Sequence, residues 1–174
     1  HMHVNDKTYV DYKEIIKNAI DNNVTKMVVI GFDLESSIKA VEIAKEYDFI
    51  YAAVGIHPSE ANKEYSNDLK EIENLLCEKV VAIGEIGLDY HHDDAIEENQ
   101  KELFVEQLKI AKKYNLPVII HSRDACKDTV DILIEHSDCY KKGIMHCYAY
   151  SYEIAKQLSK YGFIFAFGSI ILYK

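Results

Sequence analysis

Short apolar runs alternate along this chain with longer segments of helical period. Each run has the length of a strand, and the runs occupy 26–32, 49–56, 80–86, 116–122, 143–148 and 163–169. Between the runs, apolar residues recur every three or four positions, with charged residues on the opposite face. Two such sets are Leu34, Ile38 and Val41, and Phe104, Leu108 and Ala111. The pattern predicts a βα repeat in which each helix covers the sheet with one side.

Several runs are apolar on both alternating faces, which is typical of parallel strands buried on both sides. Such a chain either closes as a barrel or stays open as a doubly wound sheet. Glu85, His121 and His146 stand at successive strand ends, as in a barrel whose strands converge on one axis, and no GxGxxG or P-loop is present. We therefore predict an α/β fold of the TIM-like (β/α)8 barrel type. It would be incomplete, with about six βα units and the first and last strands missing.

Composition narrows the class of protein. The chain has 174 residues, 48% of them hydrophobic and 28% charged, which suits one domain over 1–174, truncated at the C-terminus and at the N-terminus. It shows no membrane-length apolar run and no signal-peptide pattern, so we expect a cytoplasmic protein with free thiols. A net charge of -9 argues against broad basic binding of nucleic acid, but not against a nuclease whose cations meet the phosphates.

Side chains of the type that ligate metals stand at the strand ends. His1 and His3 are separated by one residue, so on an extended chain both point to the same face. Glu85 closes one apolar run, and His121 and His146 close two later ones. Imidazole and carboxylate suit Zn, Mn, Fe or Mg, and a carboxylate can bridge two ions. A bridging role would also explain a carboxylate that burial otherwise penalises.

These residues also have ordinary structural interpretations. A single histidine at a strand end is usually a hydrogen-bonded core or surface residue, but several such ends together favour a metal site, and Gly84 and Gly87 leave room around Glu85. Arg123 is the sole arginine, and its guanidinium either binds a substrate phosphate or forms a surface ion pair. Asp89 either orients a metal ligand or begins the next loop.

Five segments carry a family resemblance. They are HVND (3–6), VGIHP (54–58), GEIGLDY (84–90), PVIIHSR (117–123) and MHCY (145–148). In this order and spacing they resemble the successive motifs of the TatD-related deoxyribonuclease family, metal-dependent hydrolases of the amidohydrolase type on a TIM-like barrel. The resemblance covers nearly the whole chain.

The resemblance implies a divalent-metal centre with one or two Mg, Mn or Zn ions. The metal ligands that it implies are His1, His3, Glu85, His121 and His146. Within that set Glu85 would be the bridging carboxylate, and Glu85 and His121 would also be catalytic. His57 would contact substrate phosphate together with Arg123, or else form a hydrogen bond that stabilises its loop.

The reaction implied by the resemblance is hydrolysis of phosphodiester bonds in DNA by metal-activated water. Two alternatives stay open: an amidohydrolase that acts on a small ester or amide, and a catalytically impaired fragment that only binds metal. The family pattern opens on an Asp-x-His-x-His-like motif and includes a late ETDxP-like aspartate, and this sequence lacks both. His1 and Met2 equally fit a cloning remnant. These departures predict weak activity for the isolated chain.

Overall fold

The chain forms a six-stranded parallel sheet with helices between the strands, in a computed structural model that describes residues 1–8, 11–61, 64–92 and 95–172. The strands are Met27–Ile30 (β1), Ile50–Val54 (β2), Val80–Asp89 (β3), Val118–Arg123 (β4), Gly143–Met145 (β5) and Phe163–Phe165 (β6). The α-helices are Tyr12–Asp21 (α1), Leu34–Glu46 (α2), Ser66–Asn74 (α3), Glu97–Tyr114 (α4), Cys126–Glu135 (α5) and Tyr152–Ser159 (α6). Short 3-10 helices cover Pro58–Glu60 (η1), Ser137–Cys139 (η2) and Ser169–Leu172 (η3).

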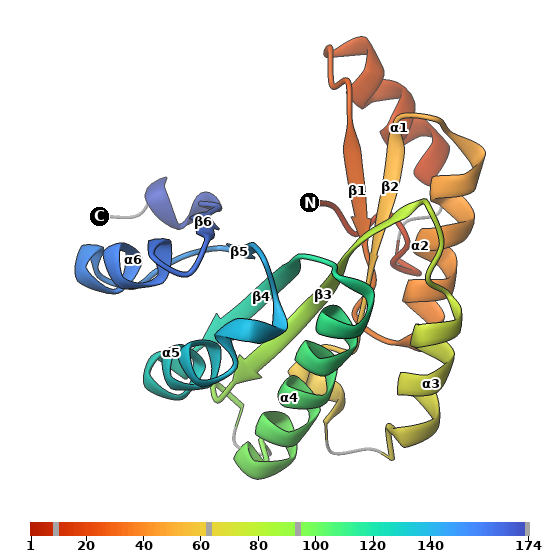
Figure 1. Cartoon of the computed structure of the whole chain (residues 1–174). Helices are drawn as coiled ribbons and strands as arrows, with labels where there is room; N and C mark the ends of the chain where they lie inside the picture. The colour runs from red at the N-terminus through yellow and green to blue at the C-terminus, as the bar shows by residue number, and fades with distance from the viewer. Residues whose placement is uncertain (9–10, 62–63, 93–94, 173–174) are drawn as a thin grey trace.

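The strands lie in sequence order, β1 to β6, and each pairs in parallel with the next. Because the order never reverses, the sheet has no topological switch point, as expected for a sheet that winds in one direction towards a barrel. Figure 1 shows this winding, with α2 beside β1 and β2, α4 beside β3, and α3 packed against α2. The predicted parallel βα repeat is confirmed.

The last two strands are shorter than predicted. The run 143–148 pairs with β4 only as far as Met145. The N–H of His146 still donates to the carbonyl of Ile120, but the next residue, Cys147, has a positive φ of 47°. The positive φ turns the chain away from strand geometry. The strand end thus becomes a turn that carries His146.

The buried side of α4 is the one that the sequence predicted, since Phe104, Leu108 and Ala111 are fully buried. The predicted side of α2 was partly wrong, because Ile38 is 40% exposed while Ser37 is fully buried. A Cβ atom on Gly31 at the end of β1 would lie 2.1 Å from Oγ of Ser37. The helix approaches the strand so closely that only small side chains fit between them.

The N-terminal segment lies along the edge of β1. Met2 pairs in parallel with Val29, its N–H donates to the carbonyl of Val28, and its carbonyl accepts from the N–H of Ile30. This extended pairing sends His1 and His3 to one side of the segment, because side chains alternate along a strand.

Three further features bear on the sequence predictions. All four cysteines are free, as predicted, and no described helix has the length and apolar character that crossing a bilayer requires. Beyond α6, large apolar side chains are exposed. They are Ile164, Phe167, Ile171 and Leu172.

Candidate metal centre

Glu85 is the centre of a cluster of histidines. It lies in the second half of β3, only 4% exposed, and three imidazoles surround its carboxylate. Nε2 of His1 lies 3.3 Å and Nε2 of His3 lies 3.6 Å from Oε2 of Glu85, and Nδ1 of His121 lies 3.1 Å from its Oε1. The charge on Glu85 therefore faces imidazole nitrogens rather than hydrocarbon.

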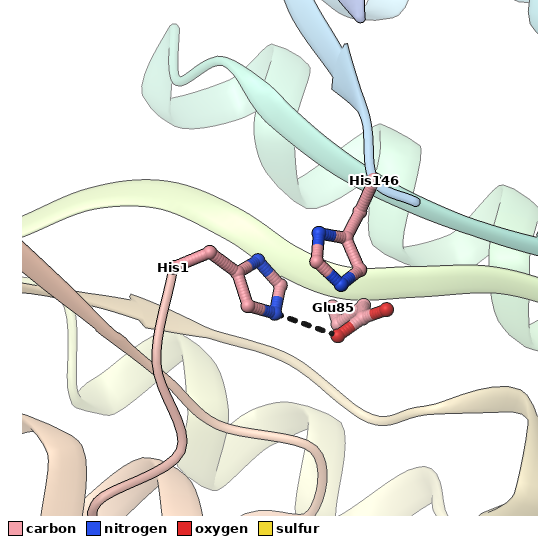
Figure 2. Close-up of side chains that lie close together, drawn as sticks. All are labelled: His1, Glu85 and His146. Carbon is pink, nitrogen blue, oxygen red and sulfur yellow. Dashed lines mark ion pairs between the residues drawn. The ribbon is translucent and has the colours of Figure 1, made fainter. Parts of the chain in front are cut away.

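His146 enters the same cluster from the turn after β5. Its ring stacks on that of His1, with centroids 3.6 Å apart and planes 4° from parallel, and Figure 2 shows both rings beside the Glu85 carboxylate. Nδ1 of His146 is buried and has no hydrogen-bond partner among the described residues. A buried ring nitrogen without a partner is costly, unless an absent ligand compensates it. The structure thus brings together all five residues that the sequence predicted as metal ligands.

Two groups of ligand atoms share Glu85. In the first, one ligand atom each of His1, Glu85 and His146 lie within 4.8 Å of one another, and in the second the same holds for His57, Glu85 and His121. Three nitrogen and oxygen donors from different parts of the chain are a usual protein contribution to a catalytic metal site. A carboxylate common to two groups also suits a pair of neighbouring ions. The donor set fits divalent metal.

Gly84 and Gly87 serve a different purpose from the one predicted. A Cβ atom on Gly87 would lie 2.0 Å from the carbonyl oxygen of His121, and one on Gly84 would lie 2.6 Å from Cβ of Ile119. These glycines permit β4 to approach β3, rather than leaving space around Glu85. The close approach brings the His121 ring against the carboxylate.

The carboxylate and its partner hold opposite charges in the metal-free chain. Burial acts to raise the pKa of Glu85, but hydrogen bonds from His121 and His3 outweigh burial and hold the pKa well below its usual range. Burial likewise acts to lower the pKa of His121, yet hydrogen bonds to Glu85 and Asp89 raise it above the ordinary value. Below its raised pKa, the protonated ring supplies positive charge that a metal ion would otherwise provide.

Hydrogen bonds fix the tautomers of two rings. Nδ1 of His3 lies 3.2 Å from the carbonyl oxygen of Ile30, which only accepts, so Nδ1 carries a proton and Nε2, 3.6 Å from Oε2 of Glu85, is the nitrogen that could bind a metal ion. His57 shows the reverse arrangement, because its Nδ1 accepts from the backbone N–H of Ser59 at 3.2 Å. Burial lowers the pKa of His57 to about 4, so the ring is neutral near pH 7 and its proton is on Nε2.

This tautomer decides between two roles for His57. The ring lies against that of His121, with centroids 4.3 Å apart, which is why it belongs geometrically to the second ligand group. A protonated Nε2 has no lone pair for a metal but can donate to an anion. The loop-stabilising hydrogen bond considered from the sequence is present at Ser59, and it leaves an N–H available to the site.

Asp89 is a buried partner of His121. Its Oδ2 lies 2.8 Å from Nε2 of His121, on the opposite side of the ring from Glu85, and its Oδ1 accepts from the N–H of His91. A carboxylate on the far nitrogen of a metal-ligating histidine fixes the ring and keeps the near nitrogen free to coordinate. Of the two roles considered from the sequence, the structure supports the orienting one.

The cluster opens into a hollow of about 540 Å³. Phe32 and Cys147 also line it, and the sequence analysis gave no role to either residue. Sγ of Cys147 lies 3.1 Å from Nε2 of His146, and only its adjacency to a predicted ligand could have drawn attention to it. Arg123 ends β4 with an exposed side chain and is not among the described residues that line the hollow.

Known proteins resemble this chain along its length. The family model described as TatD related DNase matches residues 1–174. The metal-dependent hydrolase YabD of Bacillus subtilis is 46% identical over 176 residues, covering 100% of this chain and 69% of YabD. The 3'-5' ssDNA/RNA exonuclease TatD of Escherichia coli K12 is 31% identical over 139 residues, covering 79% of this chain and 54% of TatD.

A solved structure matches the fold closely. The crystal structure of YJJV, a TatD homologue from Escherichia coli K12, superposes with a TM-score of 0.92 at 32% identity, covering 99% of this chain and 68% of that one. This chain therefore spans between about half and two thirds of the length of the proteins that it matches.

Proposed function

Because this chain belongs to the TatD related DNase family, we propose that it acts as a divalent-metal-dependent hydrolase of phosphodiester bonds in DNA. The observation that carries the proposal is the Glu85 carboxylate, whose Oε2 faces His1 and His3 and whose Oε1 faces His121. That arrangement suits the two neighbouring cations of an in-line phosphoryl displacement. The relative TatD of Escherichia coli, a 3'-5' ssDNA/RNA exonuclease, supports single-stranded nucleic acid as the substrate class.

The side chains divide into those that hold metal and those that assist. Divalent ions at the cluster would lower the pKa of bound water and offset phosphate charge. Asp89 keeps a proton on Nε2 of His121 and leaves Nδ1 to face the ion. His57 donates from Nε2 to an unesterified phosphate oxygen. The proposed metal ligands are His1, His3, Glu85, His121 and His146.

We assign Arg123 to a phosphate next to the scissile one. Its backbone pairs in register with Asp89, so its side chain leaves the sheet close to the cluster without lining the hollow. A guanidinium binds phosphate through two parallel hydrogen bonds. It is the sole arginine of a chain with net charge -9, and its positive charge would attract a phosphate next to the cluster.

The test compares substrate classes side by side. A labelled single-stranded DNA, an aryl ester and an aryl amide are incubated with the chain and manganese, and then with the chelated chain and with Glu85→Gln as controls. We expect the labelled DNA to become progressively shorter only when manganese is present and Glu85 is intact. Ester or amide turnover without DNA cleavage would favour the small-substrate amidohydrolase, and manganese binding without turnover would favour a non-catalytic metal-binding chain.

A further inference from the structure

Helix α4 presents two buried glutamines to the sheet. Gln100 is 3% exposed and Gln107 is fully buried, on a helix whose inward side is otherwise apolar. The two residues are seven positions apart, so they lie on the same side of the helix, two turns and about 10 Å from each other. A buried amide costs free energy unless both its oxygen and its nitrogen are hydrogen-bonded.

Both polar atoms of the Gln100 side-chain amide form hydrogen bonds with the backbone of Asp89. Its Oε1 accepts from the N–H of Asp89 at 2.8 Å, and its Nε2 donates to the carbonyl of the same residue at 2.8 Å. The side chain of Asp89 in turn holds Nε2 of His121. A shift of the Asp89 backbone would therefore move the carboxylate that orients His121.

Gln107 makes the same pair of bonds to Ile56. Its Oε1 accepts from the N–H of Ile56 at 2.7 Å, and its Nε2 donates to the Ile56 carbonyl at 2.9 Å. His57 follows Ile56 directly, at the point where the chain leaves β2 for η1. A Cβ atom on Gly55 would come within 3.2 Å of Oε1 of Gln107, so the amide packs closely against the strand end.

We propose that Gln100 and Gln107 are positioning residues for two separate parts of the site. Gln100 sets the orientation of His121 through Asp89, and Gln107 sets the position of the His57 ring through Ile56. One rigid helix thereby fixes the metal-binding side of the cluster relative to the phosphate-binding side. The inference deepens the proposed function. It rests on that function for the roles of His121 as a metal ligand and His57 as a donor to phosphate.

A merely structural role makes a different prediction. Buried backbone groups at strand ends need partners wherever they occur, so both glutamines could simply satisfy Asp89 and Ile56. In that case, removing either amide would loosen the whole cluster or leave it unchanged. Positioning predicts a crossed pattern, in which each substitution affects one ring and spares the other.

The experiment uses Gln100→Leu and Gln107→Leu, with Gln157→Leu on the exposed side of α6 as the matched control. The first readout is the ring-nitrogen NMR signals of His121 and His57 in the metal-free chain. The second is the dissociation constant for Mn²⁺. We expect Gln100→Leu to shift the His121 signals, spare those of His57 and weaken manganese binding about tenfold, in the range of outer partners of metal ligands.

The companion variant should behave in the opposite way. Gln107→Leu should shift the His57 signals while His121 and the manganese affinity stay as in the control. If a leucine variant does not fold, Gln100→Asn and Gln107→Asn replace it, because asparagine is neutral and one methylene shorter, so its amide does not reach both backbone groups. The asparagine variants should give the same crossed pattern.

Two results would overturn the assignment: equal shifts of both rings in both variants, or no shift of either ring. Failure of the unsubstituted chain to bind manganese counts against the proposed function alone. The ring signals of the metal-free variants still decide whether the glutamines position His121 and His57.

Discussion

Nδ1 of His121 lies 3.1 Å from Oε1 of Glu85, and this contact joins the C-terminal halves of β3 and β4 at the centre of the site. The other nitrogen of the same ring is held by Asp89 at 2.8 Å. The imidazole thus has an inner side, which faces the ligand cluster, and an outer side, which faces a supporting carboxylate. That asymmetry separates the expected effects of removing each acid.

Glu85→Ala should abolish measurable manganese binding, because it removes the carboxylate that both ligand groups share. Asp89→Ala should weaken binding about 10- to 100-fold, as expected for a partner of a ligand rather than a ligand. Isothermal titration with manganese measures both effects, and Asp89→Asn serves as the control of similar size. Equal losses in the two alanine variants, or unchanged binding in Glu85→Ala, would disprove the bridging role.

The ion pair of His121 and Glu85 should stabilise the metal-free chain more near pH 5.5 than near pH 8.5. The pKa of His121 is raised above 6.5, so its contribution is fully present below pH 6.5 and is lost as pH rises through the raised value. The pKa of Glu85 is lowered from 4.5, so its contribution is present above pH 4.5 and is lost only as pH falls through the lowered value. The ion pair therefore contributes most to the free energy of unfolding between pH 4.5 and pH 6.5, the ordinary pKa values of the two side chains.

Urea unfolding with a chelator present measures this dependence, and His121→Gln provides the comparison. The original chain should lose about 1.4 kcal/mol across the range for each unit by which the His121 pKa is raised, and the variant should not show that loss. With manganese present, affinity should instead rise with pH, because Nδ1 must lose its proton to coordinate. A pH-independent difference between chain and variant would refute the assigned ion pair.

His57→Ala should leave manganese binding unchanged and weaken the binding of inorganic phosphate to the manganese-loaded chain. The hydrogen bond from Ser59 places the His57 proton on Nε2, which makes the ring a donor rather than a ligand. Loss of one hydrogen bond to a charged group corresponds to about tenfold or more in affinity. His57→Gln keeps an N–H donor and should recover part of the loss. Weaker manganese binding in His57→Ala would show that the ring ligates metal.

Gly87→Ala should destabilise the fold by about 2–4 kcal/mol and disrupt the metal centre. The residue has a φ of 139°, and a Cβ atom there would lie 2.0 Å from the His121 carbonyl oxygen. Urea unfolding and manganese titration measure the two effects. Ser159→Ala is the control, since Ser159 is exposed on α6 and its hydroxyl donates to the carbonyl of Ala155 on the same helix. Native stability in Gly87→Ala would contradict the close approach of β3 and β4.

Arg123→Ala should weaken binding of single-stranded DNA and reduce the salt dependence of binding by about one phosphate contact. The measurement is DNA affinity at several salt concentrations, with manganese held fixed. Lys127→Ala is the control, because Lys127 is an exposed cation on the next helix that is already paired with Asp131. An unchanged salt slope in Arg123→Ala would leave this arginine as an ordinary surface residue.

Local sequence determined the order of the elements and indicated which residues are candidate metal ligands. The period of apolar residues identified all six strands and the buried side of α4, because burial of a strand or helix depends on side chains that are near in sequence. The chemistry of Glu85 and the histidines also follows from residue type, since a carboxylate after an apolar run needs a partner whatever the fold.

Only the tertiary structure decided how those residues are held. Ile38 is exposed because the approach of Gly31 to Ser37 leaves room only for small side chains, which no helical period encodes. The proton of His57 is placed by the 3-10 turn at Ser59, and His121 is held by Asp89, 32 positions earlier. Gln107 reaches Ile56 across 51 positions. Contacts between residues so far apart in sequence depend on how strands and helices pack, so the spacing of residues along the chain does not predict them.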